Sequence, residues 1–263
     1  MKIIKIPFSG GSLGKNIGCE FAPDKIIDFL KDFDLSEDKR YFSFVVDAVD
    51  INKDDFEATQ NNIYEKALNA FDNKERVVFL GGDHSLTVPL FRAFSEKYSN
   101  PGLIVFDAHA DATTHTDIPT HEDLLSSLVN GKYLNPENVI LVGLRNVWKD
   151  EEDFLNEHKI KRYTMKNISY ENTQDIADAI METARNFDAL YISFDIDVID
   201  PAFAPGTGYL EPAGLSAREI IYFIHRLKNL PNIKAIDLVE VNPEKDIQDM
   251  TSKLAAKMIL EMF

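Results

Sequence analysis

The chain has 263 residues, of which 44 are Asp or Glu and 28 are Lys or Arg, so its formal net charge is −16. This acidity argues against a nucleic-acid partner and against adsorption to an anionic membrane, because both require a basic surface. No apolar run approaches the ~18 residues of a membrane span, and the single cysteine, Cys19, excludes an intramolecular disulfide and suits a reducing compartment. We therefore expect a soluble, cytoplasmic protein that folds as one domain over residues 1–263.

Short β-branched or aromatic runs alternate with longer helical patterns along the chain. The predicted strands cover Lys2–Pro7, Ser43–Ala48, Arg76–Leu80, Leu103–Asp107, Asn138–Leu144, Lys161–Thr164, Ala189–Asp197 and Lys234–Val241. The predicted helices cover Asp24–Asp32, Phe56–Asn73, Val88–Tyr98, Glu151–His158, Asn172–Asn186, Ser216–Lys228 and Asp246–Met262. Several strands are continuously apolar, which is typical of strands covered on both faces. The pattern predicts an α/β fold, a three-layer sandwich around a mostly parallel, doubly wound sheet of about eight strands.

Three of the predicted strands end in residue types that bind metal ions. Six such residues follow them: His84, then Asp107, His109 and Asp111, and finally Asp195 and Asp197. Alternate residues of an extended chain point to the same side, so we expect these side chains to converge. Four carboxylates packed together would repel one another unless cations lie between them. Carboxylates and imidazoles without thiolates suit manganese, zinc, iron or nickel, so we predict a site for two divalent metal ions.

Each of these motifs alone has a plainer interpretation. A single Asp-x-Asp at a strand end usually caps a turn, and a single His after two glycines usually lies in a loop. Asp107-Ala-His-Ala-Asp111 is more specific, because three ligand types alternate directly after an apolar strand. Three such motifs at successive strand ends are hard to explain as caps, so we favour the metal site.

Together with a fourth segment, these motifs resemble the ureohydrolases, the arginase–agmatinase family. The matching segments are Gly81-Gly-Asp-His-Ser85, Asp107-Ala-His-Ala-Asp111, Ser193-Phe-Asp-Ile-Asp-Val-Ile-Asp-Pro-Ala-Phe-Ala-Pro-Gly-Thr-Gly208 and Asp237-Leu-Val-Glu-Val-Asn-Pro243. The resemblance runs in order from about Pro7 to the carboxyl terminus and includes Gly143-Leu-Arg145. It implies an arginase-like fold, a homo-oligomer (trimer or hexamer) and a small cationic guanidino substrate.

The resemblance also implies two Mn²⁺ ions, with other divalent transition metals as alternatives. One ion would be held by His84, Asp107, Asp111 and Asp195, and the other by Asp107, His109, Asp195 and Asp197, with Asp107 and Asp195 bridging. A hydroxide between the metals would attack the guanidinium carbon, and the tetrahedral intermediate would collapse to urea and an amine. Asp111 would pass a proton to the leaving amine.

Glu240 lies in the run 235–241, which is apolar apart from Asp237 and Glu240 itself, and an unpaired carboxylate is costly to bury there. It either pairs with a nearby Lys or Arg or, as the family match implies, receives the substrate guanidinium through charge-assisted hydrogen bonds. We favour the second interpretation because the local match includes Asn242-Pro243.

His121 follows Asp111 by ten residues, a spacing that resembles agmatinases more than arginases. In the family a histidine here shuttles protons and is followed by Gly, whereas this chain has Glu122. The alternative is a solvent-exposed loop histidine. His115, on the same loop, is a weaker candidate for the shuttle.

The chain differs from arginases where they bind the end of the substrate that is distant from the guanidinium group. Trp148 stands where an acidic residue is expected after Gly-x-Arg, and the loop after Asp111 lacks the Asn–Ser arrangement that holds an amino acid. Besides Glu240, we expect Thr207, Trp148 and Glu151 to contact the substrate. These departures favour agmatine, which would give putrescine, over arginine, which would give ornithine. Another guanidino or formimino substrate is a further alternative.

Asp83 and Asp200 flank the ligands, and we expect them to orient imidazoles or loop amides. An alternative of a different class is a non-catalytic, metal-binding regulatory member of the family. The complete set of ligand positions argues against it, as does Glu240. A metallophosphoesterase would need a cluster of Arg or Lys in these motifs, which they lack.

Overall fold

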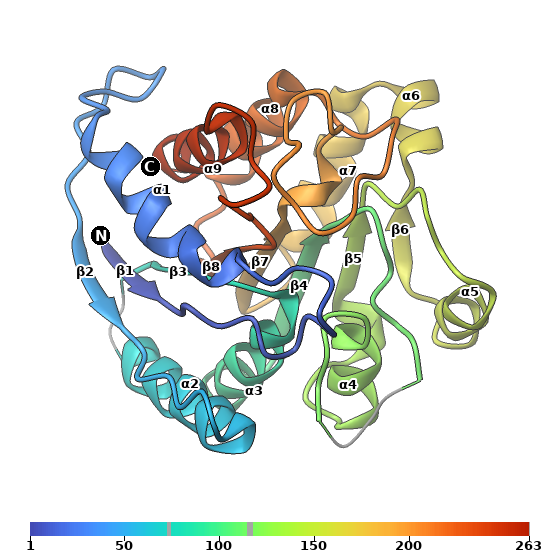
Figure 1. Cartoon of the computed structure of the whole chain (residues 1–263). Helices are drawn as coiled ribbons and strands as arrows, with labels where there is room; N and C mark the ends of the chain where they lie inside the picture. The colour runs from blue at the N-terminus through green and yellow to red at the C-terminus, as the bar shows by residue number, and fades with distance from the viewer. Residues whose placement is uncertain (73–74, 115–117, 263) are drawn as a thin grey trace.

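The computed structural model describes residues 1–72, 75–114 and 118–262 (Figure 1). Within them lies a sheet of 8 strands in the order β2-β1-β3-β8-β7-β4-β5-β6, and every neighbouring pair is parallel. The strands are β1 (Lys2–Lys5), β2 (Val45–Ala48), β3 (Val77–Leu80), β4 (Pro101–Phe106), β5 (Val139–Val142), β6 (Lys161–Tyr163), β7 (Ala189–Asp195) and β8 (Ile233–Val239). The predicted parallel sheet is confirmed.

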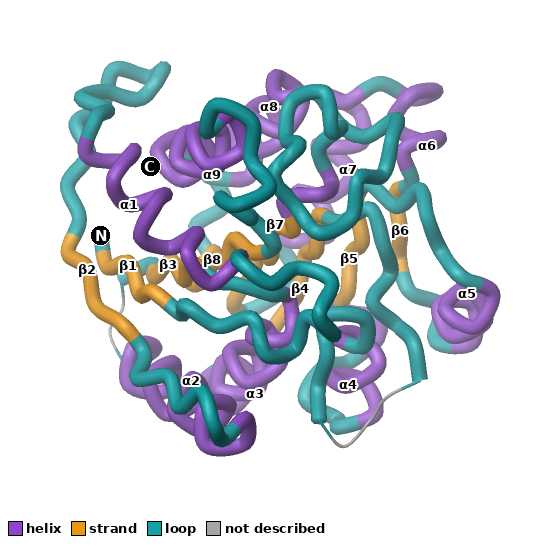
Figure 2. Tube along the Cα trace, viewed as in Figure 1, coloured by secondary structure: helices purple, strands orange, loops and turns teal. Residues whose placement is uncertain are grey.

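Helices cover both faces of this sheet (Figure 2). One layer contains α1 (Ala22–Lys31), α6 (Met165–Glu171), α7 (Thr173–Ala184), α8 (Ala217–Leu227) and α9 (Met250–Glu261). The other contains α2 (Phe56–Phe71), α3 (Thr87–Lys97), α4 (Leu124–Asn130) and α5 (Lys149–Glu157). The predicted three-layer sandwich is thus confirmed. Helices α4 and α6 were not predicted, because with 7 residues each they are too short to show a helical period.

Alternate residues of the central strands pack against opposite layers. In β3, Val77 and Phe79 face the layer that contains α2 and α3, whereas Val78 and Leu80 face the layer that contains α1 and α9. This follows from the two-residue period of a strand and explains why the run is continuously apolar. All four residues are buried, so the carboxyl end of β3 is firmly fixed.

The four strands β3, β8, β7 and β4 are neighbours in the centre of the sheet. Because they are parallel, their carboxyl ends lie at the same edge, where ligands bind in open α/β sheets. Asp195 is the last residue of β7, and the other predicted metal ligands and Glu240 follow shortly after the ends of these four strands. Among the described helices, none is both long and apolar enough to cross a membrane.

Candidate metal centre and substrate pocket

Asp195 is the last residue of strand β7, whereas the other predicted metal ligands lie beyond the strands, in turns and loops. β4 ends at Phe106, and residues 196–198 form a 3₁₀ turn directly after β7. Asp111 has a left-handed φ of 48°. The convergence of the ligands is therefore as predicted, but the reason given for it, alternation along an extended strand, is wrong. The turns are held by their own carboxylates, since Asp195 accepts a hydrogen bond from the Asp197 N–H at 2.8 Å.

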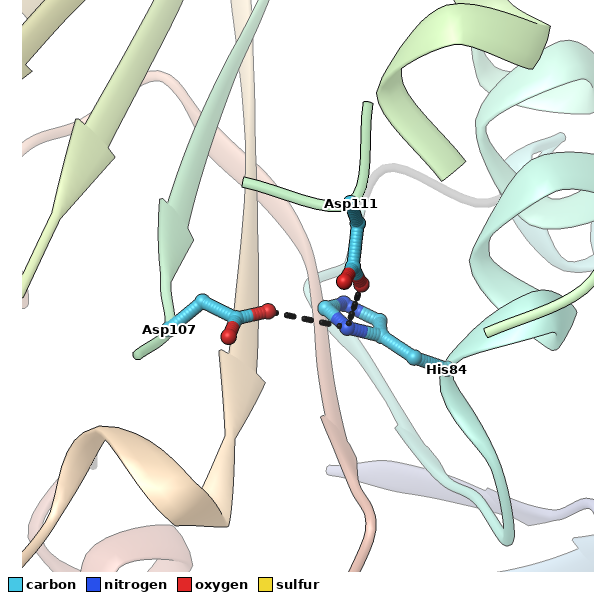
Figure 3. A group of neighbouring side chains, drawn as sticks. All are labelled: His84, Asp107 and Asp111. Atoms are coloured by element: carbon cyan, nitrogen blue, oxygen red, sulfur yellow. Dashed lines mark ion pairs between the residues drawn. The ribbon is translucent and has the colours of Figure 1, made fainter. Parts of the chain in front are cut away.

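His84 lies at the centre of a first cluster of ligands. Its Nδ1 lies 2.9 Å from Asp111 Oδ2, 3.2 Å from Asp107 Oδ2 and 3.3 Å from Asp195 Oδ2. Figure 3 shows the Asp107 and Asp111 carboxylates pointing toward this imidazole. Among the described residues, neither His84 Nδ1 nor Asp107 Oδ2 has a partner in hydrogen-bonding geometry, although both are buried. Such orphaned polar atoms are rare, and an ion that binds between them is one explanation.

A second cluster adjoins the first and shares Asp107 with it. His109 Nδ1 lies 3.0 Å from Asp197 Oδ2 and 3.5 Å from Asp107 Oδ1. Asp107 thus directs one oxygen toward each histidine, as a bridging ligand would. Within each of the triads His84/Asp107/Asp111 and Asp107/His109/Asp197, the ligand atoms lie within 4.8 Å of one another. The donor set fits two divalent metal ions, while the bridging role of Asp195 stays a prediction.

The charges of the two clusters also favour cation binding. Burial and the neighbouring Asp107 raise the pKa of Asp111 to about 7. Burial and the carboxylates of Asp197 and Asp107 raise the pKa of Asp195 well above its usual range. Burial opposes protonation of His84, but the three carboxylates around it raise its pKa well above the ordinary value. Protons offset the crowded negative charge here, and bound metal ions would displace them.

A buried polar chain that the sequence analysis missed orients His84. His84 Nε2 lies 2.9 Å from Ser193 Oγ, which donates a hydrogen bond to Asp237 Oδ1 at 2.6 Å. Asp237 Oδ2 accepts hydrogen bonds of 2.8 Å from Tyr191 and Thr87. Since Ser193 gives its proton to Asp237, it accepts one from Nε2, which leaves the Nδ1 lone pair facing the carboxylates. The sequence did contain a sign of this chain, since Tyr191 and Asp237 are polar residues in otherwise apolar strands.

Glu240 is a buried, ionised carboxylate beside the metal ligands. Its Oε1 accepts a hydrogen bond from the His84 N–H at 2.7 Å, and its Oε2 accepts one from Asn16 Nδ2 at 2.6 Å. Burial would raise its pKa, but the contacts with His121 and Asn16 outweigh burial and lower it. The alternative prediction, that Glu240 pairs with a nearby Lys or Arg, is wrong, because no Lys or Arg of the described residues pairs with it. Asn16 was missed because it lies 224 residues away in the sequence.

His121 is 5% exposed, so it is not a solvated loop histidine. Its N–H donates a hydrogen bond to the Gly11 carbonyl at 3.0 Å, and its Nδ1 lies 3.4 Å from Glu240 Oε1. Burial opposes protonation, but Glu240 raises the pKa of His121 to about 9. Its Nε2 has no hydrogen-bond partner among the residues described and lies 3.9 Å from Glu122 Oε1. The other shuttle candidate, His115, lies outside the described residues.

The remaining predicted substrate contacts all border a single pocket. Its walls are formed by His109, Asp111, Thr113, His121, Glu122, Asn146, Trp148, Glu151, Asp195, Asp197, Thr207, Tyr209, Glu211 and Glu240. Thr207 is buried in the wall, whereas Trp148 is 55% exposed at the rim. Glu151 uses both oxygens to hold backbone amides, those of Ala112 at 3.1 Å and Trp148 at 2.8 Å. Glu122, Tyr209 and Glu211 are wall residues that the sequence analysis did not propose.

Asp83 and Asp200 orient loop amides, which is one of the two roles predicted for them. Asp83 accepts hydrogen bonds from the N–H groups of Gly11 and Ser85, at 2.8 and 2.9 Å. Asp200 accepts hydrogen bonds from loop amides as well, those of residues 202 and 214, at 2.9 and 3.1 Å. The other predicted role is not realised in the described residues, because neither carboxylate contacts an imidazole.

Comparisons with known proteins agree with this site. A profile of the Arginase family matches residues 1–263. The arginase of Staphylococcus aureus (strain MRSA252) is 29% identical over 296 aligned residues, which cover 99% of this chain and 96% of that protein. The formimidoylglutamase of Halalkalibacterium halodurans is 30% identical and covers 98% of this chain and 84% of its own length. The crystal structure of formimidoylglutamase from Bacillus subtilis superposes with a TM-score of 0.94 at 26% identity, covering 99% of this chain and 85% of that chain. The chain therefore belongs to the arginase family, enzymes that hydrolyse carbon–nitrogen bonds of guanidino and amidine compounds.

Proposed function

We propose that the enzyme hydrolyses a guanidino compound that lacks a carboxylate, with agmatine as the substrate and putrescine and urea as the products. The charge of the pocket carries this proposal. Seven carboxylates line it, and no Lys or Arg of the described residues borders it. Asp111, Asp195 and Asp197 are predicted metal ligands whose charge the metal ions would offset, but Glu122, Glu151, Glu211 and Glu240 are not. Such a pocket attracts a cation and repels an anionic group. A substrate with a cationic centre at each end matches it better than an amino acid.

Glu240 is the residue we assign to the guanidinium group. A guanidinium is planar and presents several N–H donors, which a carboxylate accepts through short charge-assisted hydrogen bonds. The His84 N–H and Asn16 Nδ2 fix the Glu240 carboxylate in place before substrate arrives. Positioning of this kind lowers the reorganisation that the reaction requires.

The residues that would hold two Mn²⁺ ions are His84, Asp107, His109, Asp111, Asp195 and Asp197. When bound, divalent metal ions lower the pKa of water and so supply a nucleophile near neutral pH. We assign to Asp111 the transfer of a proton to the leaving amine, because it borders both the ligand cluster and the pocket. His121 is assigned the exchange of protons with solvent, because its Nε2 has no hydrogen-bond partner among the described residues.

Arginine is the second candidate substrate, since a protein named arginase is 29% identical over 99% of this chain. Its carboxylate would need donors in the pocket. Two neutral donors of the pocket wall are already engaged, because Asn146 Nδ2 donates to Glu211 Oε1 at 2.8 Å and Thr113 Oγ1 donates to the Glu122 carbonyl at 2.8 Å. This engagement favours agmatine.

A substrate panel tests the proposal. The protein is stripped of metal with a chelator, reloaded with Mn²⁺, and given agmatine, arginine, guanidinobutyrate, guanidine or formiminoglutamate, with urea, ammonia and formamide as readouts. We expect agmatine to give urea with the highest kcat/KM. Release of formamide from formiminoglutamate, or of urea from arginine alone, would show that this compound and not agmatine is the substrate. Two bound metal ions without any product would instead indicate a non-catalytic regulatory member.

Three finer expectations accompany this proposal. Manganese is the expected native metal, the assembly is expected to be a trimer or hexamer, and the cytoplasm is the expected location. Elemental analysis of protein purified from its own host tests the metal, light scattering tests the assembly, and cell fractionation tests the location.

A further inference from the structure

The pocket wall contains three carboxylates that no step of the proposed chemistry uses, Glu122, Glu151 and Glu211. Glu122 lies directly after His121, and its side chain is 26% exposed where it borders the pocket. We infer that Glu122 binds the terminal ammonium group of the substrate and thereby selects aminoalkylguanidines over other guanidino compounds, an inference that rests on the hydrolase function proposed above.

Glu122 has an oxygen available for a ligand. Its Oε1 accepts a hydrogen bond from the Tyr209 hydroxyl at 3.0 Å, whereas its Oε2 has no partner among the described residues. The backbone of Glu122 is fixed, because its carbonyl accepts hydrogen bonds from the N–H and the hydroxyl of Thr113, at 3.1 and 2.8 Å. The carboxylate is therefore held in place with one face open. Preorganised charge of this kind binds a cation without a large loss of side-chain entropy.

The other two unused carboxylates, Glu151 and Glu211, already hold protein groups of the pocket wall. Glu151 accepts hydrogen bonds from two backbone amides, one on each oxygen. Glu211 Oε1 accepts a hydrogen bond from Asn146 Nδ2 at 2.8 Å and lies 3.5 Å from His109 Nε2, where it orients a metal ligand. Glu211 Oε2 has no partner among the described residues, but Glu211 contacts the predicted metal ligand His109, whereas Glu122 contacts His121 and Tyr209 and no predicted metal ligand. We therefore assign the distal ammonium group to Glu122.

Glu122 also lies at a suitable distance from the guanidinium site. Glu240 and Glu122 each direct an Oε1 toward one nitrogen of the His121 ring, at 3.4 and 3.9 Å. Because the two ring nitrogens are ~2 Å apart, the two carboxylate oxygens are at most about 10 Å apart. With bonds of ~1.5 Å, a four-carbon arm places an ammonium roughly 7 Å from a guanidinium carbon. One dication of this length can reach both carboxylates.

Tyr209 completes the subsite. Its ring stacks on the His121 ring at a centroid distance of 5.8 Å and an interplanar angle of 18°. It also meets the His109 ring edge-on at 5.3 Å. The Tyr209 hydroxyl donates to Glu122 Oε1 at 3.0 Å and so orients the carboxylate. The aromatic face would line the alkyl arm while Glu122 receives its charged end.

The test compares agmatine with pentylguanidine, in which a methyl group replaces the ammonium, on Mn²⁺-loaded wild type and Glu122→Gln. The variant keeps the size of the side chain and its contact with Tyr209. We expect kcat/KM for agmatine to fall about tenfold or more, mostly through KM, because a hydrogen bond to a charged group is lost. Hydrolysis of pentylguanidine should change less than about twofold. The control variant is Glu152→Gln, whose carboxylate binds Arg162 at 2.8 Å and does not border the pocket.

Two results would overturn the inference while leaving the hydrolase function in place. An equal loss with both substrates would show that Glu122 acts on folding or chemistry, and an unchanged preference for agmatine would show that the ammonium binds elsewhere. If wild type releases no urea, the proposed function fails instead. Calorimetric binding of agmatine to both proteins then still decides the inference, because a tenfold loss of affinity in Glu122→Gln supports it and an equal affinity contradicts it.

Discussion

Replacement of Ser193 by alanine tests whether the buried polar chain behind His84 prepares it to bind metal. The Ser193 hydroxyl is 2.9 Å from His84 Nε2 and donates to Asp237 Oδ1 at 2.6 Å. Without it, the His84 ring loses the partner that fixes its tautomer, and the proton can move to the nitrogen that faces the carboxylates. In that tautomer His84 Nδ1 carries a proton and cannot bind a metal ion, so only a fraction of the molecules can bind metal at any time.

Two effects of different size follow from the loss of these contacts. Removal of the partner that orients a metal-binding histidine weakens metal affinity by about 10- to 100-fold. Two buried hydrogen bonds are also lost, one of them to a carboxylate, which corresponds to roughly 2–3 kcal/mol of folding free energy. Asp237 retains its bonds to Tyr191 and Thr87, so we expect the variant to fold.

Competition with a fluorescent chelator measures the Mn²⁺ affinity, and denaturation measures the stability. Thr87→Val is the matched control, because it removes a 2.8 Å hydrogen bond to the other oxygen of Asp237 without touching the Ser193 hydroxyl or His84. Both variants should lose stability, but only Ser193→Ala should lose affinity for manganese. Equal affinities in the two variants would refute the reasoning.

Three further perturbations probe other parts of the molecule. Asp195→Ala should weaken both metal sites and reduce urea release by more than about 10³-fold, because it removes metal binding worth several kcal/mol. Near-normal turnover, or the loss of only one ion, would contradict the bridging role of Asp195. Glu240→Gln should bind metal normally but lose about 10²- to 10³-fold in kcat/KM, and unchanged kinetics would move the guanidinium pocket elsewhere. Buried Glu261 accepts hydrogen bonds from Lys257 at 2.6 Å and from the Glu37 N–H at 2.8 Å. Burial would raise its pKa, but Lys257, His225 and the Glu37 N–H outweigh burial and lower it. The stability that the ionised carboxylate contributes is therefore present at neutral pH and is lost as pH falls through the folded-state pKa. Glu261→Gln should therefore cost about 2 kcal/mol at pH 7 and much less near pH 3, and an equal loss at both pH values would contradict this.

The central strands were predictable because their hydrophobic pattern reports burial directly. β3 and β4 are buried on both faces, and their runs Val77–Leu80 and Leu103–Phe106 are continuously apolar. The edge strand β2 was predicted from its β-branched residues although Val45 and Val46 are exposed. Short helices such as α4 lie below the length at which periodicity becomes visible.

The chemistry of the site was predictable in residue type but not in geometry. Asp111 and Glu240 both have positive φ, at 48° and 65°, and a sequence does not announce such conformations for non-glycine residues. The contact of Asn16 with Glu240 and the link from Ser193 to Asp237 join segments far apart in the chain. Tertiary packing alone creates these partners, so the sequence indicated the candidate ligands but not the residues that support them.

The central claim, a two-metal hydrolase for a dicationic guanidino substrate, is tested most directly by one titration with two readouts. Metal-free protein receives Mn²⁺ in steps while urea release from agmatine and from arginine is recorded. We predict that activity rises until two ions are bound per chain and that kcat/KM for agmatine then exceeds that for arginine by about tenfold or more, as expected for loss of one charged contact. Full activity with a single ion, a preference for arginine, or two bound ions without urea from either compound would contradict the account.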